Sequence, residues 1–124
     1  MKLLLDTHAA LWWLADDDRI GDEVARQLTD DSNQVLISAV VVWEVAIKRS
    51  LGKLEAPEAI GPTLVQAGAQ PLPVTIEHAA AVEDLPWVHR DPFDRLLVAQ
   101  ALTEDAALVS CDEPFSQYGV SIVW

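Results

Sequence analysis

The sequence predicts a three-layer α/β/α sandwich, in which helices cover both faces of a mostly parallel central sheet. Short apolar runs of strand length alternate along the chain with longer segments in which apolar residues recur at helical spacing. The chain has 124 residues, the size of one ordinary domain, and 51% of them are hydrophobic against 23% charged. We therefore expect residues 1–124 to form a single domain around one core.

Each predicted strand is a short apolar run between polar or turn-forming residues. The first begins close to the N-terminus and stops at Asp6, and the last closes the chain. Strands are expected at residues 2–5, 35–37, 107–109 and 120–123, with an extended segment at 71–74. Because helical segments lie between them, the strands are expected to pair mainly in parallel.

Local signals mark where the predicted helices begin and end. Asp6 can cap the first helix and Ser38 the third, because a side-chain oxygen at this position accepts from a free backbone N–H. Pro92 suits the first turn of the last helix, whereas Gly61-Pro62 should break the fourth into short pieces. Helices are expected at residues 8–15, 21–28, 39–51, 57–68, 76–84 and 92–102.

Motifs and composition exclude several classes of function. No G-x-G-x-x-G or Gly-Lys-Ser/Thr sequence occurs, so dinucleotide and P-loop phosphate sites are absent. Cys111 is the single cysteine, which excludes an internal disulfide and a Cys-rich zinc site and suits a reducing compartment. The longest uncharged run, residues 35–43, is too short to span a membrane, and the leucines at 3–5 are too few for a signal peptide. We expect a cytoplasmic protein without a membrane segment.

The chain is strongly acidic, with 20 Asp and Glu against 8 Lys and Arg and a formal net charge of −12. Nucleic-acid affinity rests on Lys and Arg that neutralise phosphates, so this charge alone argues against a polyanionic partner. It suits a basic protein partner or a site that recruits cations.

Four acidic residues stand in informative positions: Asp6, Glu44, Asp94 and Asp112. Asp6 and Asp112 follow strands whose carboxyl ends should meet at one edge of a parallel sheet, where such sheets bind ligands. Glu44 and Asp94 have apolar neighbours at helical spacing, so both are expected to face inward. Together the four would carry about −4, which one divalent ion halves and two cancel. Oxygen ligands favour Mg²⁺ or Mn²⁺, one or two per site, and such ions activate water for phosphoryl transfer.

Each of these acids also has a purely structural explanation. Asp6 could serve only as a helix cap, and Asp94 only to complement the helix dipole. Asp112 precedes Glu113-Pro114, a sequence typical of turns. Glu44 is hardest to explain in this way, because an ionisable residue in so apolar a setting is unusual. The conjunction of the four, rather than any single one, favours a metal site.

Four segments of the chain carry a family resemblance: Leu3–Ala9, Ser38–Glu44, Asp91–Ala101 and Val109–Asp112. In this order and spacing they resemble the successive motifs of PIN-domain proteins, and more narrowly the VapC-type toxins of type II toxin–antitoxin pairs. The four acids match the family's acidic positions, and Ser110 matches its small hydroxyl residue before the last acid.

The resemblance implies an endoribonuclease that depends on Mg²⁺ or Mn²⁺ and is restrained by a cognate antitoxin protein. It also implies a homodimer and cleavage of specific tRNA, rRNA or mRNA molecules. Asp6 and Asp94 would then be the principal metal ligands, and Glu44 would bind metal or orient bound water. Asp112, helped by Ser110, would complete the site or hold a second ion.

Contacts to RNA phosphates are harder to assign on so acidic a chain. Lys48, Arg49 and Lys53, spaced over little more than one helical turn, are the best candidates, followed by Arg90 and Arg95. The alternative explanation for the first three is an ordinary solvated helix end, where cations suit the dipole.

Further residues have weaker assignments. His89 and Asp91 could support the site from its surroundings or could be ordinary loop residues. Five tryptophans could stack bases, but core or partner-facing positions are favoured for them: Trp12, Trp13, Trp43, Trp87 and Trp124. Of these, Trp43 is expected to be buried, as is the Cys111 thiol. His78 lacks the spacing of a metal-binding pair and should make core or solvent contacts.

Two other functions remain open at this level. An apolar strand ending in Asp6 also opens the haloacid-dehalogenase-like phosphatases, but these place a second aspartate where this chain has His8. Alternatively, the acidity could serve only to bind a basic partner, in a non-catalytic interaction module.

Overall fold

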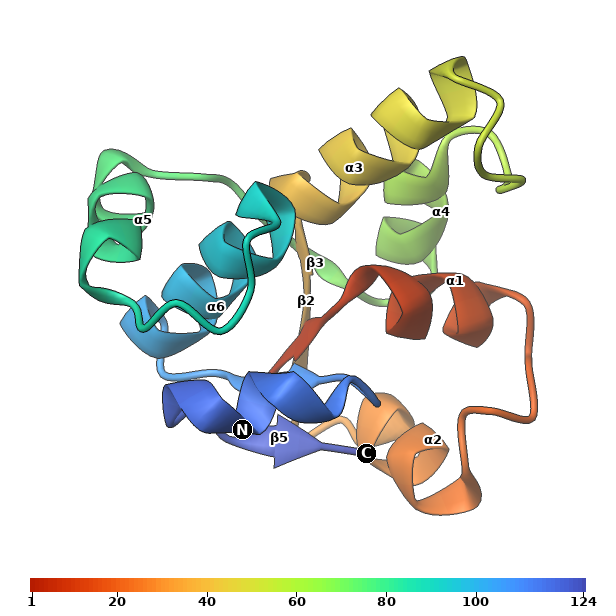
Figure 1. Cartoon of the computed structure of the whole chain (residues 1–124). Coiled ribbons are helices and arrows are strands. Elements are labelled where there is room, and N and C mark those ends of the chain that lie inside the picture. The colour runs from red at the N-terminus through yellow and green to blue at the C-terminus, as the bar shows by residue number, and fades with distance from the viewer.

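The computed structural model describes all 124 residues and contains one five-stranded sheet (Figure 1). The strands lie in the order β3-β2-β1-β4-β5, and every pairing between them is parallel. They are β1 (Lys2–Leu5), β2 (Gln34–Ser38), β3 (Gln70–Leu72), β4 (Ala107–Val109) and β5 (Ile122–Val123). The extended segment expected near residue 71 is thus a strand of the sheet.

Helices fill the connections between successive strands, as parallel pairing requires. They are α1 (Thr7–Leu14), α2 (Asp22–Thr29), α3 (Ala39–Ser50), α4 (Ile60–Gln66), α5 (Ile76–Ala81) and α6 (Pro92–Thr103), with the 3₁₀ helices η1 (Val82–Asp84) and η2 (Glu113–Tyr118). None of them combines the length and the apolar character needed to cross a membrane.

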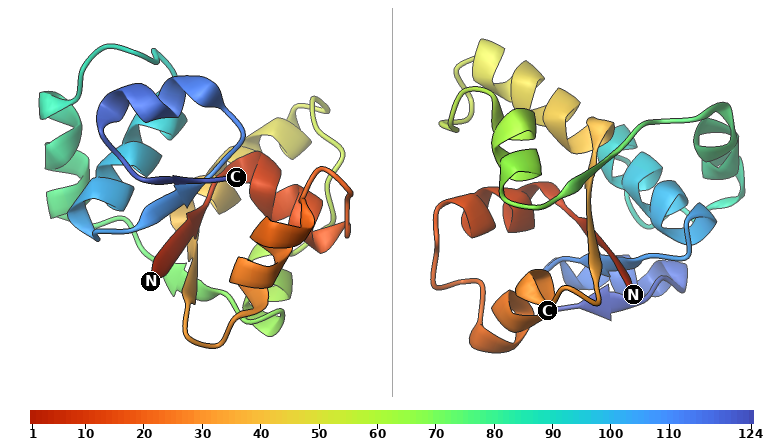
Figure 2. Two further views of the ribbon diagram at one scale, coloured as in Figure 1. Left: turned by 90° about the horizontal axis from the view of Figure 1, so that it is seen from below. Right: turned by 180° about the vertical axis from the view of Figure 1, so that it is seen from behind.

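The strand order decides on which face each helix lies. The path from β1 through β2 to β3 runs in one direction across the sheet, and the chain then crosses back to β4 and β5. Right-handed connections therefore place the helices of the two halves on opposite faces. Figures 1 and 2 show α1, α2 and α4 on one side and α5 and α6 on the other. The predicted α/β/α sandwich is confirmed.

The core centres on β1, which lies between β2 and β4. Its residues Leu3, Leu4 and Leu5 have no exposed surface. A continuous apolar run, rather than an alternating one, is expected of a parallel strand covered on both faces. The buried apolar side chains form one connected cluster of 28 residues.

Two regions differ from the sequence-based expectation. The helix expected over residues 57–68 begins only at Ile60 and is not broken, because Gly61 and Pro62 fall within its first turn. A proline there interrupts no intrahelical hydrogen bond. After Asp112 the chain forms η2 rather than a simple turn, and the last strand is shorter than expected.

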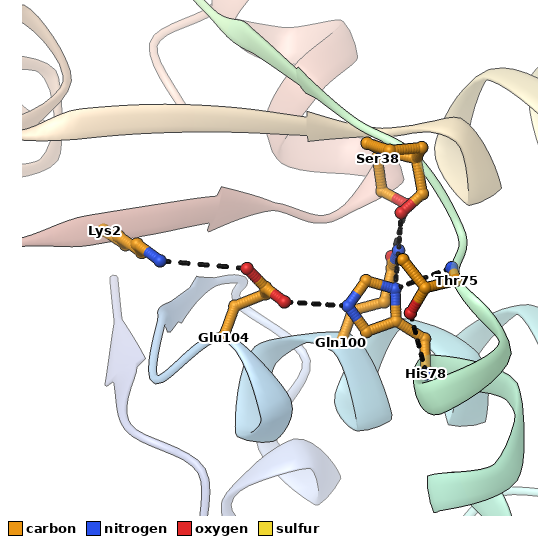
Figure 3. A network of polar contacts seen from close by, with 7 residues as sticks. Lys2, Ser38, Thr75, His78, Gln100 and Glu104 are labelled. Carbon is orange, nitrogen blue, oxygen red and sulfur yellow. Dashed lines mark hydrogen bonds and ion pairs between the residues drawn. The ribbon is translucent and has the colours of Figure 1, made fainter.

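A buried polar network ties the two helices α3 and α6 to each other (Figure 3). The Ser38 hydroxyl, which caps α3, donates to the Gln100 side chain of α6. The Gln100 amide is 3.3 Å from His78 Nδ1, which also accepts from the Thr75 backbone N–H at 3.0 Å. The proton of this buried imidazole therefore lies on Nε2 and points to Glu104 at 2.9 Å. His78 makes core contacts, as expected, and the network fixes how α3 and α6 cross.

Candidate active site

Asp6 and Asp112 lie where the strand order of the sheet reverses. β1 and β4 are neighbours, but β1 continues to β2, whereas β4 is reached from the edge strand β3. The carboxyl ends of parallel strands open a crevice at such a point. Asp6 follows β1 directly, and its backbone N–H donates to Val109 at the end of β4 over 3.1 Å. Asp112 follows β4 closely, at the start of η2.

Asp6 caps a helix and also faces this crevice. Its Oδ1 accepts from the Ala9 backbone N–H at 2.7 Å, so the expected cap is present. The residue is only 7% exposed. Burial raises the pKa of Asp6, and hydrogen bonds from Ser110 and Ala9 offset part of that rise. The capping hydrogen bond uses only Oδ1 of Asp6, so Oδ2 could still bind a metal ion.

Glu44 and Asp94 reach the same crevice from two helices that pack against each other, α3 and α6. Glu44 is 8% exposed, and both of its oxygens have partners. Thr7 donates to Oε1 at 2.7 Å, and the Lys48 ammonium lies 2.5 Å from Oε2. Asp94 lies in the first turn of α6, which Asp91 caps by accepting from the Phe93 and Asp94 backbone N–H groups.

All four acids line one cavity of about 530 Å³. Asp91 and Lys48 also line it, and aromatic side chains form part of its wall: Trp12, Phe93 and Phe115. Segments separated by up to about a hundred residues of chain thus contribute carboxylates to one place. This is the largest concentration of acidic side chains within any cavity described for the fold.

The carboxylates that line the cavity repel one another, and this repulsion changes the pKa of Asp94. Partial burial raises the pKa of Asp94 to about 6, and the nearby carboxylates of Asp91, Glu44 and Asp112 add to the rise. The Lys48 ammonium is the nearest positive side chain, and its hydrogen bond to Glu44 raises the pKa of the lysine. The cavity therefore favours either protons or cations.

Asp112 is held by Ser110 and His89, and His89 is held in turn by Tyr118. Its backbone N–H donates to Ser110 Oγ at 3.0 Å. His89 Nε2 lies 3.1 Å from Asp112 Oδ2, and His89 Nδ1 lies 2.9 Å from the Tyr118 hydroxyl. That hydroxyl accepts from the His89 backbone N–H at 2.8 Å, so its own proton is free to go to Nδ1. The arrangement leaves the Nε2 proton for Asp112.

Thr7 and Tyr118 are site residues that the sequence analysis missed. The available signal for Thr7 is its position one residue after a strand-end acid. Tyr118 carries no local signal, because η2 alone brings it to His89. His89 contacts Asp112, so its placement is compatible with a supporting role.

The carboxylate groups of the cavity are of the type that binds a hard divalent cation. In this structure, however, they do not surround one common point. Carboxylate oxygens are the ligands that Mg²⁺ and Mn²⁺ prefer. No group of three or more His, Cys, Asp or Glu side chains is close enough to hold an ion in this structure. Lys48 and Thr7 occupy the oxygens of Glu44, and Ala9 occupies one oxygen of Asp6.

Several of the residues predicted to contact phosphate are paired with carboxylates or buried. Lys48 pairs with Glu44, and Arg49 lies 4.0 Å from Glu58. The assignment of Arg95 to phosphate binding is wrong, because its side chain is buried and donates to backbone carbonyls. The segment just before α6, residues 82–87, supplies these contacts.

Two burial predictions are also wrong. Trp43 is 55% exposed, with its ring 4.9 Å from that of Phe93. α3 is apolar on several sides, so periodicity could not identify the face that turns outward. Cys111 is exposed at the rim of the cavity, because the chain leaves the sheet after β4.

Several solved structures share this fold. VapBC2 from Rickettsia felis, bound to a DNA fragment from its promoter, has 17% identity and a TM-score of 0.73, covering 100% of this chain and 99% of that one. VapBC-1 from nontypeable Haemophilus influenzae has 17% identity and a TM-score of 0.70, covering 99% and 97%. FitAcB from Neisseria gonorrhoeae has 18% identity and a TM-score of 0.64, covering 98% and 96%.

The sequence itself finds no significant match among curated proteins. The family model for the PIN domain, however, matches residues 3–120. This stretch contains all four acids of the cavity and the whole sheet except Lys2 and strand β5. The chain belongs to the PIN domain family.

Proposed function

We propose that this chain is a metal-dependent endoribonuclease, the toxin of a type II toxin–antitoxin pair, and that residues 1–124 act as one nuclease domain. PIN domains are nucleases, which supports hydrolysis of a phosphodiester bond. The observation that carries the proposal is the convergence of Asp6, Glu44, Asp94 and Asp112 on one cavity at the reversal point of the sheet.

The roles of the residues follow from their surroundings. Asp6 and Asp94 are the proposed principal ligands, because both line the cavity. Asp6 lies at the end of β1, and Asp94 lies in the first turn of α6. Glu44, held by Thr7, is placed to bind the ion or to orient water. Asp112, oriented by His89 and Ser110, completes the site. A bound Mg²⁺ or Mn²⁺ would lower the pKa of water and stabilise charge on the phosphate oxygens.

The proposed partners are an RNA substrate and a cognate antitoxin. The similar structures from Rickettsia felis and Haemophilus influenzae are VapBC assemblies, and one from Klebsiella pneumoniae is a toxin–antitoxin complex. By analogy we propose that an antitoxin restrains this chain, that the chain forms a homodimer, and that tRNA, rRNA or mRNA is cut in the cytoplasm. Asp91 supports the site by capping α6.

The first experiment is cleavage of total RNA and of defined tRNA transcripts with and without EDTA, followed by addition of Mg²⁺ or Mn²⁺. We expect cutting only when a divalent ion is available. Glu44→Gln, purified identically, controls for contaminating ribonuclease. Equal cutting in EDTA, or by the variant, would contradict the proposal.

The alternatives give different results in the same preparations. A phosphatase of the haloacid dehalogenase kind would turn over small phosphate esters. The position where it needs a second aspartate is His8, which stacks on Trp12 at 5.3 Å, so we expect no such turnover. A non-catalytic module would leave every RNA intact under all conditions.

Lys48 competes with a metal ion for Glu44, which gives a second prediction. Lys48→Met is expected to lower the metal concentration for half-maximal cleavage about two- to fivefold at saturating RNA. The reason is that a partly exposed ion pair contributes roughly 0.2–1 kcal/mol. Lys48→Arg keeps the pair and should resemble the parent. An unchanged metal midpoint in Lys48→Met would show that the ammonium does not compete.

A further inference from the structure

Most of the positive charge on this chain is already neutralised. Of the eight Lys and Arg residues, five lie within 4.0 Å of a carboxylate: Lys2, Arg19, Arg26, Lys48 and Arg49. Arg95 is buried and donates to backbone carbonyls. Lys53 and Arg90 are exposed and have no acidic partner. Lys53 and Arg90 are therefore the Lys and Arg side chains that remain free to contact a phosphate.

Arg90 is accompanied by an unusually exposed aromatic side chain, Trp87. Trp87 is 80% exposed, although tryptophan is among the largest apolar residues. The Arg95 guanidinium lies 4.0 Å from the ring centroid and is itself only 4% exposed. Hydrogen bonds from Arg95 to Pro86 and Val82 fix that guanidinium, at 2.9 and 3.1 Å. The ring is thus supported by a buried cation while most of its surface remains open.

Trp87 and Arg90 line a second cavity, of about 380 Å³, together with Pro92 and Leu96. Residues 90–93 line both this cavity and the acidic one. Arg90 and Pro92 line the second cavity, while Asp91 and Phe93, which alternate with them in sequence, line the first. A nucleic-acid strand that leaves the acids across residues 90–93 therefore comes to Arg90 and Trp87.

We propose that Trp87 and Arg90 form a nucleotide subsite beside the active cavity, in which a base of single-stranded RNA stacks on Trp87 and a phosphate contacts Arg90. The inference rests on the proposed ribonuclease function and deepens it. Stacking on an aromatic ring accepts any base, and an arginine binds phosphate through two parallel hydrogen bonds. The subsite explains how a chain of net charge −12 holds RNA: stacking carries no charge penalty, and the local cation is free.

The test is the affinity for a short, fluorescein-labelled single-stranded RNA, measured by anisotropy in EDTA over a series of salt concentrations. Trp87→Leu, which keeps an apolar side chain, is expected to weaken binding roughly tenfold without changing the salt slope. Trp87→Phe should restore most of the affinity. Arg90→Gln should weaken binding and reduce the slope of log K against log salt by about 0.7, one phosphate contact.

Two matched variants complete the design. Arg26→Gln removes an exposed arginine of α2 with the same change in charge, and Ile76→Ala truncates an apolar side chain that is 90% exposed. Both should bind RNA like the parent. In cleavage assays with metal, Trp87→Leu and Arg90→Gln should raise KM with little change in kcat, because the subsite binds substrate and transition state alike. Thermal melts of every variant exclude unfolding as the cause.

The outcomes separate the subsite from the proposed function. If the parent neither binds nor cuts RNA, both ideas fail together. If the parent cuts RNA while Trp87→Leu and Arg90→Gln bind it normally, the subsite alone is overturned and Trp87 is left to contact a protein. A reduced salt slope in Lys53→Gln but not in Arg90→Gln would place the phosphate contact at the end of α3 and would also overturn it.

Discussion

Asp94→Asn is expected to reduce metal-dependent RNA cleavage by at least about a hundredfold. Loss of a residue that merely supports a metal ligand already costs roughly 10- to 100-fold, and Asp94 is proposed to be a ligand itself. Asparagine has nearly the same size as aspartate but carries no charge. The cap of α6 is kept as well, because Asp91 accepts from the backbone N–H groups of residues 93 and 94. Initial rates on a defined transcript, with metal varied up to saturation, measure the loss.

The same variant should be more stable than the parent above pH 6 in EDTA. The pKa of Asp94 is raised from 3.8 to about 6, so the fold favours the protonated carboxyl. The stability that this proton contributes is complete below pH 3.8 and is lost as the pH rises through 6. Asparagine cannot ionise, so Asp94→Asn should gain on the order of 1 kcal/mol at pH 8, after allowance for solvent screening, and nothing near pH 4.

Urea unfolding of both proteins at the two pH values measures this difference. An inactive variant that is more stable at pH 8 would show that cleavage is lost through the site and not through unfolding. Near-parental cleavage by Asp94→Asn would remove this residue from the metal site. A variant less stable than the parent at pH 8 would show that the carboxylate is not repelled by its neighbours.

Arg95→Met should lower the free energy of unfolding by about 3 kcal/mol. The buried guanidinium donates to the carbonyls of Pro86, Val82 and Leu85 at 2.9, 3.1 and 3.4 Å. Methionine fills similar space but leaves these acceptors without their donor, and each such loss costs roughly 1–3 kcal/mol when the group stays dry. Chemical denaturation followed by circular dichroism gives the value.

Two variants control this prediction. Arg95→Lys keeps the charge but not the planar fork, so its stability should lie between those of parent and Arg95→Met. Arg26→Met removes an exposed arginine paired with Glu23 and should change stability by less than about 0.5 kcal/mol. If Arg95→Met were as stable as Arg26→Met, water would be satisfying the three carbonyls and the arginine would be dispensable to the fold.

Much of the architecture was predictable because local signals agree with the final packing. Ser38 and Asp6 cap the helices expected of them, and Pro92 opens the last long helix. Uninterrupted apolar runs such as Leu3–Leu5 can be satisfied only inside a covered sheet. The expectation that Gly61-Pro62 breaks the fourth helix is wrong. The effect of a proline depends on its distance from the helix start, and no capping side chain marks that start, which follows Ala59.

The sequence alone determined the succession of strands and helices along the chain. It also determined that acids stand at strand ends and within apolar helix faces. Both features depend on patterns only a few residues long. The tertiary structure alone decided which charges remain available. Arg95 is buried against residues 82–87, and Arg90 is left free beside Trp87. Lys48, by contrast, pairs with Glu44 at the i,i+4 spacing that a helix sets. The reason is physical: the burial of a charge depends on what the fold packs against it, and no fixed spacing along the chain encodes this.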